Sequence, residues 1–124
     1  MGNILFQDET HKQFFNSMLE KADRGGDVYH EAFFYLMGLT EETRRHISQM
    51  YDFKDHCLIF EGLNQGWQTG TTIMICRLAI NLFNGYCGDD PRSAQHYTPY
   101  ELFCCSYQRY MFEAIKLRYP EYYH

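Results

Sequence analysis

The apolar residues of this chain recur three and four positions apart over most of its length, which is the spacing of one face of an α-helix. In the N-terminal half, residues that favour the N-cap position stand just before such segments, at Asp8, Asp27 and Thr40. Glycines supply the stops of the first two segments, at Gly25-Gly26 and at Gly38. The sequence therefore predicts helices over residues 9–23, 28–37 and 41 to about 51.

The most apolar segment runs from Ile73 to Phe83 and contains two polar side chains, Arg77 and Asn81. These two are four residues apart, so they share one face of a helix. A helix that is apolar almost all round is normally buried at the centre of a domain, and this one is too short to span a membrane. Its expected ends are Thr69 or Thr71 as the cap and Asn84-Gly85 as the stop.

The remaining segments are less regular. Residues 57–60 are an apolar run too short to classify by period, either a strand or a buried extended piece. Residues 86–97 are expected to form the longest loop, because a Gly-Asp-Asp-Pro turn signal lies within them. The sequence Thr-Pro-Tyr-Glu at 98–101 combines an N-cap residue, a proline at the first helical position and a glutamate three residues after the cap. It predicts a helix that continues to about Arg118, with a kink or a break at Ser106.

Length and composition bound the fold. At 124 residues the chain is long enough for one domain whose core needs no disulfide or metal. Its residues are 45% hydrophobic and 18% aromatic, which excludes a disordered chain. We expect one helical domain over residues 1–124. Its fold class is mostly all-α, a compact bundle of five or six helices around a buried central helix near 71–83, with at most a short strand pair.

Charge and cysteine content limit the classes of function that we expect for this protein. The net charge of -5 argues against broad, sequence-independent binding to nucleic acid, which depends on clustered Lys and Arg. The five cysteines are an odd count, and the sequence starts without a secretory signal. We therefore expect reduced thiols, a cytoplasmic protein and no contact with a membrane. The available metal ligands lack the spacing of a zinc site, so we expect no metal or other cofactor. They are His46, His56, Cys57, Cys87, His96, Cys104 and Cys105.

Six motifs are spread along nearly the whole chain: TRRHI (43–47), YDF (51–53), GWQTGT (66–71), RLAINLFNG (77–85), FCCSY (103–107) and EAIKLRYPEY (113–122). Together they resemble a family of small uncharacterised cytoplasmic proteins of Gram-positive bacteria and their mobile elements, classed as a domain of unknown function. The resemblance implies a free-standing single domain. It implies no activity, ligand or catalytic residue, so any chemistry has to be argued from the residues themselves.

The loop Gly66–Thr71 leads into the expected central helix and is the first candidate binding site. Its glycines let backbone N–H groups approach a ligand, and the start of a helix favours an anion. Arg77, or Arg44 and Arg45 from the preceding helix, would complete a site for phosphate or carboxylate. The alternative is a capped helix start with Trp67 packed in the core.

The polar stripe of the central helix is the second candidate. A buried charge without a partner is very costly, so Arg77 and Asn81 need partners. A structural ion pair of Arg77 with Asp52, Asp55 or Glu61 is the alternative to a ligand site. The candidate binding residues are Trp67, Gln68, Arg77, Asn81, Arg44 and Arg45.

The sequence contains no catalytic signature. A nucleophile motif such as GxSxG is absent, and Cys104 or Cys105 with His96 is a set of residue types without a known arrangement. We therefore expect a protein that is not an enzyme.

The C-terminal segment carries more tyrosines than one helix face can bury, so part of it is expected to form a contact surface. We favour a protein–protein interaction module, monomeric or homodimeric, in which acidic and tyrosine side chains dock onto a basic groove. Its partner would be a host protein or ribonucleoprotein complex that handles nucleic acid, and an anti-CRISPR-like inhibitor is one form of this hypothesis. The mobile-element context comes from the resemblance. The alternative is a small-ligand, anion or zinc-binding domain with a site near Trp67–Arg77. The expected interface tyrosines are Tyr107, Tyr110, Tyr119 and Tyr122, with Tyr123 beside them.

Overall fold

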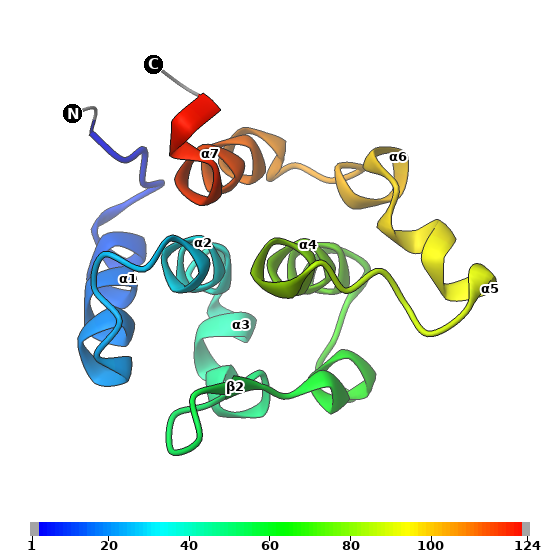
Figure 1. Ribbon diagram of the computed structural model, residues 1–124, viewed down its shortest axis with the longest axis horizontal. Helices are drawn as coiled ribbons and strands as arrows, with labels where there is room; N and C mark the ends of the chain where they lie inside the picture. The colour runs from blue at the N-terminus through cyan, green and yellow to red at the C-terminus, as the bar shows by residue number, and fades with distance from the viewer. Residues whose placement is uncertain (1–2, 123–124) are drawn as a thin grey trace.

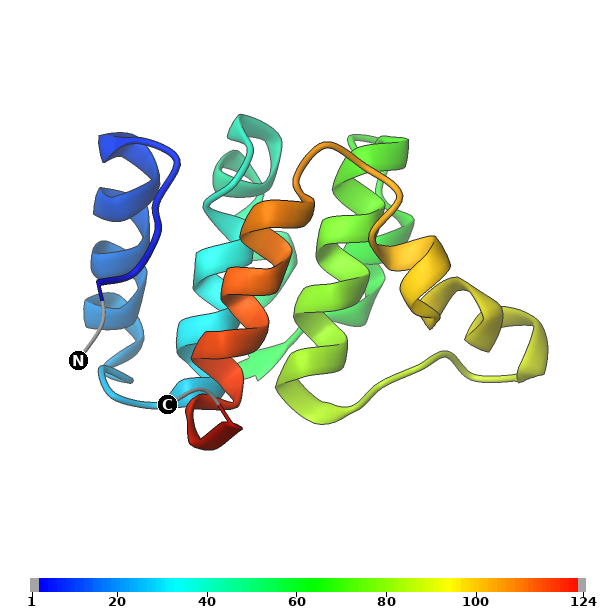
Figure 2. The ribbon, with the colours of Figure 1, turned by 90° about the horizontal axis from the view of Figure 1, so that it is seen from above.

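Helix α2 (Val28–Met37) runs through the middle of the structure, with α1 (Glu9–Ala22) on one side and α4 (Gly70–Asn84) on the other (Figure 1). Helix α7 (Gln108–Arg118) lies across one face of α2 and α4, as Figure 2 shows. The side chains of residues 32–37 have no exposed surface. From Ala32 onward, α2 is therefore apolar and buried on every side, and this part of the helix forms the centre of the hydrophobic core.

The helix that the sequence predicts near 71–83 is present as α4, and it shares the core with α2. Its inner face is fully buried, including Ile75 and Ile80. Its outer face, which carries Arg77 and Asn81, is half-buried. Burial of α4 is thus one-sided, and its polar stripe faces the surface.

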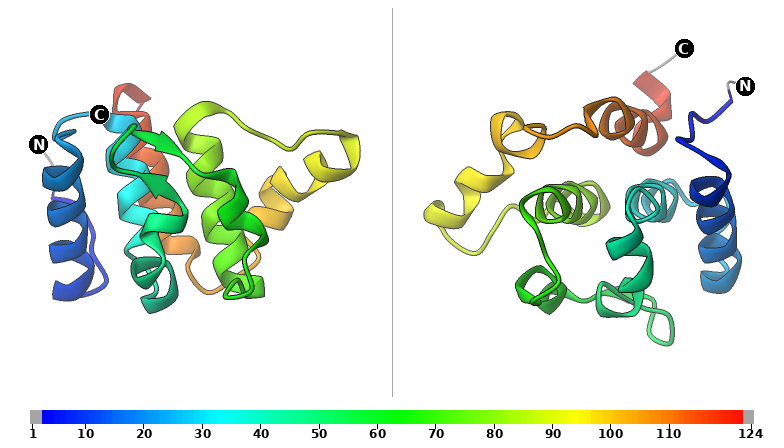
Figure 3. Two further views of the ribbon diagram at one scale, coloured as in Figure 1. Left: turned by 90° about the horizontal axis from the view of Figure 1, so that it is seen from below. Right: turned by 180° about the vertical axis from the view of Figure 1, so that it is seen from behind.

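The computed structural model describes residues 3–122, and seven α-helices make up most of this range, so the mostly all-α fold predicted from the sequence is confirmed. The two strands are antiparallel, with Tyr51 opposite Leu58. Figure 3 shows this hairpin on the side of α2 and α4 opposite to α7. The shorter α-helices are α3 (Glu41–Arg45), α5 (Pro91–Ala94) and α6 (Pro99–Leu102). The strands are β1 (Tyr51–Asp52) and β2 (Cys57–Leu58). The 3-10 helices are η1 (Ile47–Gln49), η2 (Phe60–Asn64), η3 (Gln95–Tyr97) and η4 (Pro120–Tyr122).

The predicted starts of the first two helices are confirmed. The Asp8 carboxylate accepts a hydrogen bond from the backbone N–H of His11 at 2.9 Å. The Asp27 carboxylate accepts from Tyr29 N at 2.9 Å. Each bond satisfies an N–H group that the first helical turn leaves without an intrahelical partner. Within residues 3–122, no helix is long and apolar enough to cross a membrane.

The helix predicted over 41–51 is wrong in its length, because α3 ends at Arg45. Its first turn is tied back to the end of α2: the Thr43 hydroxyl donates to Met37 O at 2.6 Å, and the Arg44 guanidinium donates to Gly38 O at 2.8 Å. The chain then passes through η1 into β1, where Tyr51 pairs with the second strand. Pairing in the hairpin overrides the weak helical pattern of this segment.

The continuous helix predicted from 98 to about 118 is also wrong, since the chain breaks between α6 and α7. The expected cap does not form. The Thr98 hydroxyl donates to Gln95 O at 3.3 Å, and the Glu101 carboxylate lies 3.3 Å from His96 Nδ1. Both side chains are thus engaged with η3, which precedes them. The break includes Ser106, as the sequence suggested.

The segment expected to be the longest loop, 86–97, contains α5 and η3. The Asp90 carboxylate caps α5 by accepting from Ser93 N at 2.8 Å, and Pro91 occupies the first helical position. The turn signal was therefore the start of a short helix.

Candidate functional site

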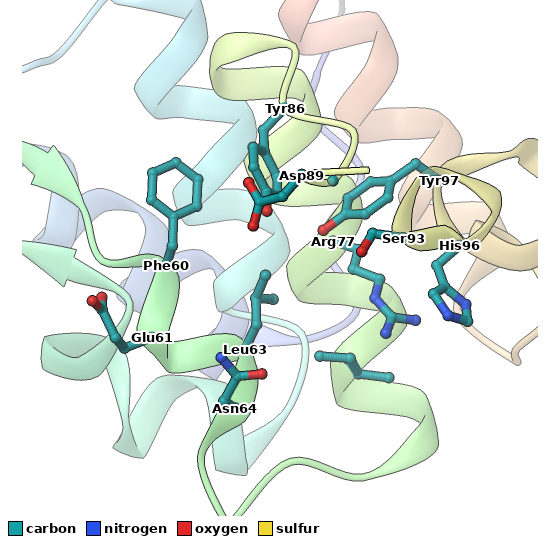
Figure 4. Close-up of a pocket in the computed structure, with 12 residues that line it drawn as sticks. Phe60, Glu61, Leu63, Asn64, Arg77, Tyr86, Asp89, Ser93, His96 and Tyr97 are labelled. Atoms are coloured by element: carbon teal, nitrogen blue, oxygen red, sulfur yellow. The ribbon is translucent and has the colours of Figure 1, made fainter. Parts of the chain in front are cut away.

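A cleft of about 310 Å³ opens between η2, the outer face of α4 and the segment 86–97 (Figure 4). The three walls come from parts of the chain that are distant in sequence. The side chains that define its chemistry are Phe60, Asn64, Arg77, Tyr86, Asp89 and Tyr97.

The η2 wall depends on the close approach of Gly62 to the end of η1. A Cβ atom at Gly62 would overlap Met50 Sδ and the Gln49 carbonyl, so a larger residue does not fit there. The Ile59 N–H donates to Met50 O at 2.9 Å, and the Gln68 side chain donates to Gly62 O at 2.9 Å. These contacts fix the position of Phe60 and Asn64 on either side of Gly62.

The opposite wall begins where α4 ends. Asn81 Nδ2 donates to Tyr86 O at 3.1 Å, and Asn84 Oδ1 accepts from Tyr86 N at 3.0 Å. The backbone of Tyr86 is therefore held from both sides by the last turns of α4. Its ring lies against that of Phe60, with 4.8 Å between the ring centroids. Asn81, a predicted binding residue, thus positions the cleft wall.

Asp89 is held by the tight turn before α5. Gly88 has φ +96°, and a Cβ atom there would overlap Ser93, so glycine is required at this position. Asp90 caps α5, which leaves the preceding carboxylate of Asp89 directed toward the cleft (Figure 4). Tyr97 closes this wall, its ring edge-on to Tyr86 at 5.7 Å.

Arg77 extends from α4 into the cleft, beside Tyr97 (Figure 4). Its side chain is half-buried, and no carboxylate in residues 3–122 lies within 4.0 Å of it. The expected ion pair with Asp52, Asp55 or Glu61 is therefore not formed. The Asp52 carboxylate instead accepts from the backbone of its own turn, including Lys54 N at 2.9 Å.

The charged groups of the cleft shift the pKa values of its two tyrosines, Tyr86 and Tyr97. Burial and the neighbouring Tyr86 raise the pKa of Tyr97, and the positive charge of Arg77 opposes this rise. Desolvation and the adjacent Asp89 carboxylate raise the pKa of Tyr86. Arg77 and Asp89 thus act on neighbouring hydroxyl groups, so a cation and an anion face the same opening.

Of the candidate binding residues Trp67, Gln68, Arg77 and Asn81, Arg77 is the one that lines this cleft. The Trp67 ring is stacked on His46 at 4.5 Å, and Trp67 Nε1 donates to Gln49 at 2.8 Å. Gln68 points inward to Gly62 O, as described above.

Two backbone N–H groups at the start of α4 are already bonded to side chains of its own cap. The Thr69 hydroxyl accepts from Thr72 N at 3.1 Å, and the Thr72 hydroxyl accepts from Thr69 N at 2.7 Å. This reciprocal capping box matches the alternative interpretation of the loop, a capped helix start. Arg44 is used at the end of α2, and Arg45 pairs with Glu41 on the surface at 2.6 Å.

The expected interface tyrosines differ in their exposure to solvent. Tyr107, Tyr110 and Tyr119 are half-buried and pack against the core, whereas Tyr122 is 74% exposed. Tyr123 lies outside the described residues. The most exposed aromatic side chains besides Tyr122 are Tyr100, at 82%, and Phe112, at 54%.

Within residues 3–122, no three His, Cys, Asp or Glu side chains converge to hold a metal ion. A model of a family of unknown function (DUF6075) matches residues 1–124. The chain belongs to this family. No curated protein and no solved structure matches it. Membership assigns no activity, so the function must be argued from the cleft.

Sequence reasoning missed the wall formed by Tyr86, Asp89 and Tyr97, because it took residues 86–97 as a loop without a role. One signal was available there. Two tyrosines flank a turn that contains consecutive acidic residues, and binding residues are concentrated in such connecting segments.

Proposed function

We propose that this protein binds a small anionic ligand, such as a carboxylate, in the cleft, without transforming it. The observation that carries the proposal is the half-buried Arg77 guanidinium, which opens into the cleft with no carboxylate of residues 3–122 within 4.0 Å. A partly desolvated guanidinium favours an anion and binds a carboxylate through two parallel hydrogen bonds. The cleft volume, about 310 Å³, lies at the lower end of the range for ligand sites, roughly 300–1,000 Å³.

Arg77 has a hydrogen-bond partner in Tyr97, but its partners differ from those of two other arginines. Arg44 and Arg118 donate to the backbone carbonyls of Gly38 and Leu82. These side chains bind the ends of helices, where carbonyl groups lack intrahelical partners. The guanidinium of Arg77 faces the cleft beside Tyr97 instead, and an anionic ligand would supply the charged partner that it lacks within residues 3–122.

Binding is preferred to catalysis because the nucleophile of the cleft is not activated. Ser93 and His96 both line the cleft, and Glu101 lies 3.3 Å from His96 Nδ1. In the described part of the chain, however, the Ser93 hydroxyl has no hydrogen bond to the His96 ring. A serine nucleophile requires that bond to lose its proton.

The test is a titration of the ¹⁵N-labelled protein with benzoate, a planar carboxylate, followed by two-dimensional NMR. We expect saturable shifts of the backbone amides of Arg77, Tyr86 and Asp89, which disappear in Arg77→Gln. Arg45→Gln is the matched control, because Arg45 is an exposed arginine paired with Glu41 on α3. Absence of any saturable shift, or equal shifts in wild type and Arg77→Gln, would contradict the proposal.

A second proposal is the interaction module expected from the sequence, with a host protein or ribonucleoprotein complex as partner and a mobile-element origin. It is favoured by the exposed Tyr100, Phe112 and Tyr122. The exposed face of α7 around Phe112 carries Arg109 and Lys116, so its charge suits an acidic partner more than the basic groove first envisaged. A pull-down that captures one partner with wild type, and not with Phe112→Ala, would support it. Equal capture by both proteins would contradict it.

A further inference from the structure

The cleft contains an anion as well as a cation. Asp89 extends from the segment 86–97 into the same opening as Arg77 (Figure 4). No Lys, Arg or His nitrogen in residues 3–122 lies within 4.0 Å of the Asp89 carboxylate. The two charged groups therefore face the opening from different walls, and neither has an ionic partner within the described chain.

The rings of Phe60 and Tyr86 lie on the side of the cleft that carries Asp89, whereas Tyr97 lies beside Arg77 (Figure 4). Phe60 is 37% exposed, and its ring meets that of Tyr86 at an angle of 46°. Together the two rings offer an electron-rich surface, which attracts an ammonium group placed over it. Asp89 lies next to Tyr86, so the carboxylate and the ring faces favour the same cationic group.

The opposite end of the opening suits a carboxylate. Arg77 supplies paired N–H donors, and Figure 4 shows the Asn64 side chain, which has a further donor, directed toward the same space. Glu61 also lines the cleft, but its carboxylate is exposed and points away from the centre of the opening in Figure 4. Glu61 therefore does not neutralise the positive end.

We infer that the ligand is a zwitterion, a small molecule with an ammonium group bound by Asp89, Phe60 and Tyr86 and a carboxylate bound by Arg77. This inference rests on the proposed function, because it assigns the anionic group of the ligand to Arg77. It adds that a second, opposite charge on the same molecule contributes to affinity. Amino acids with separated amino and carboxyl groups are the simplest members of this class.

The experiment compares three matched sets of probes by calorimetry. The first set is β-alanine, 4-aminobutyrate and 6-aminohexanoate, the second is the unsubstituted carboxylates of the same lengths, and the third is the alkylamines of the same lengths. We expect at least one amino acid to bind about tenfold more tightly than its unsubstituted carboxylate, since a charge-assisted hydrogen bond is worth about that factor. Asp89→Asn should remove this advantage and leave the affinity of the carboxylates unchanged.

Glu61→Gln is the matched control, because it removes a carboxylate from the same cleft without removing the one that faces the opening. Its affinity for the amino acids should stay within about twofold of wild type, a change much smaller than the tenfold step. If the carboxylates bind through Arg77 but the amino group adds nothing, the zwitterion inference fails and the proposed function stands. If no carboxylate binds, the proposed function fails and the inference fails with it.

Discussion

The rings of Phe60 and Tyr86 lie 4.8 Å apart, although the whole of α4 separates these residues in sequence. This contact joins two walls of the cleft. Phe60→Ala should lower the free energy of unfolding by about 1 kcal/mol, the value of an aromatic pair, and weaken benzoate binding severalfold. Urea denaturation and calorimetry measure the two effects. Tyr100→Ala, which removes an 82% exposed ring, should change neither, and equal losses in both variants would contradict this role for Phe60.

The turn at Gly88 holds Asp89 in place. Gly88→Ala should lower the free energy of unfolding by about 1–3 kcal/mol, because alanine is strained at φ +96° and its Cβ atom would overlap Ser93. It should also remove the amino-acid preference of the cleft. Gly66→Ala is the control, since no atom within 4 Å of Gly66 would meet a Cβ there. A Gly88→Ala protein as stable as wild type would show that the turn tolerates a side chain.

Replacement of the two threonines predicted as caps, Thr69 and Thr98, should lower the stability of the protein by different amounts. Thr69→Ala should cost about 0.5–2 kcal/mol, because its hydroxyl caps α4 by accepting from Thr72 N. Thr98→Ala should cost less than about 0.5 kcal/mol, because Thr98 forms no cap in the structure and is exposed. Chemical denaturation of both variants provides the comparison. A larger loss for Thr98→Ala than for Thr69→Ala would contradict the observed absence of a Thr98 side-chain cap on α6.

Two buried histidines should make stability depend on pH. Desolvation lowers the pKa of His11 and of His30, against the opposing effects of Tyr35 O on His11 and Asp27 on His30. The unfolded chain, with an ordinary pKa near 6.5, therefore binds more protons than the folded chain as the pH falls below about 6.5. This contribution to stability is fully present above that value and is lost as the pH falls toward the lowered pKa values.

The free energy of unfolding should accordingly decrease between about pH 7.5 and pH 5.5. His11→Gln should reduce the size of that decrease, since His11 Nε2 lies 2.7 Å from Tyr35 O in the core and glutamine does not titrate. Burial raises the pKa of Glu31, which contributes with the opposite sign at more acidic pH. Urea denaturation at the two pH values measures the effect. The same decrease in wild type and His11→Gln would show that His11 is not responsible.

The sequence predicts α1, α2 and α4 well because each has a clear cap, a strong apolar period and a glycine or polar stop. It fails at 41–51 and at 98–118 because side chains in those segments bind groups of the preceding element, five or six residues back along the chain. Thr43 and Arg44 tie α3 to the end of α2, and Glu101 binds His96. The spacing of apolar residues does not reveal contacts of this kind, so the helix boundaries predicted for 41–51 and 98–118 were wrong.

The residues of the candidate site could also be predicted only in part from the sequence. Sequence reasoning placed Arg77 with Trp67, but Arg77 lies seven residues into α4, about 10 Å along the helix axis from its start at Gly70. Its actual neighbours, Tyr86 and Tyr97, follow α4 and fold back along its outer face. Arg77 was identified because a charge within an apolar helix requires an explanation. Its neighbours were missed because their position depends on the turn at Gly88 and on α5.

The most direct test of the anion site is the side-chain Nε–Hε signal of Arg77 in ¹⁵N NMR spectra during titration with benzoate. The account predicts that this signal shifts saturably, with the same dissociation constant as the cleft amides. The signals of Arg44 and Arg45, which have partners in the protein, should not move. An Arg77 signal that stays in place while benzoate saturates another site would contradict the account.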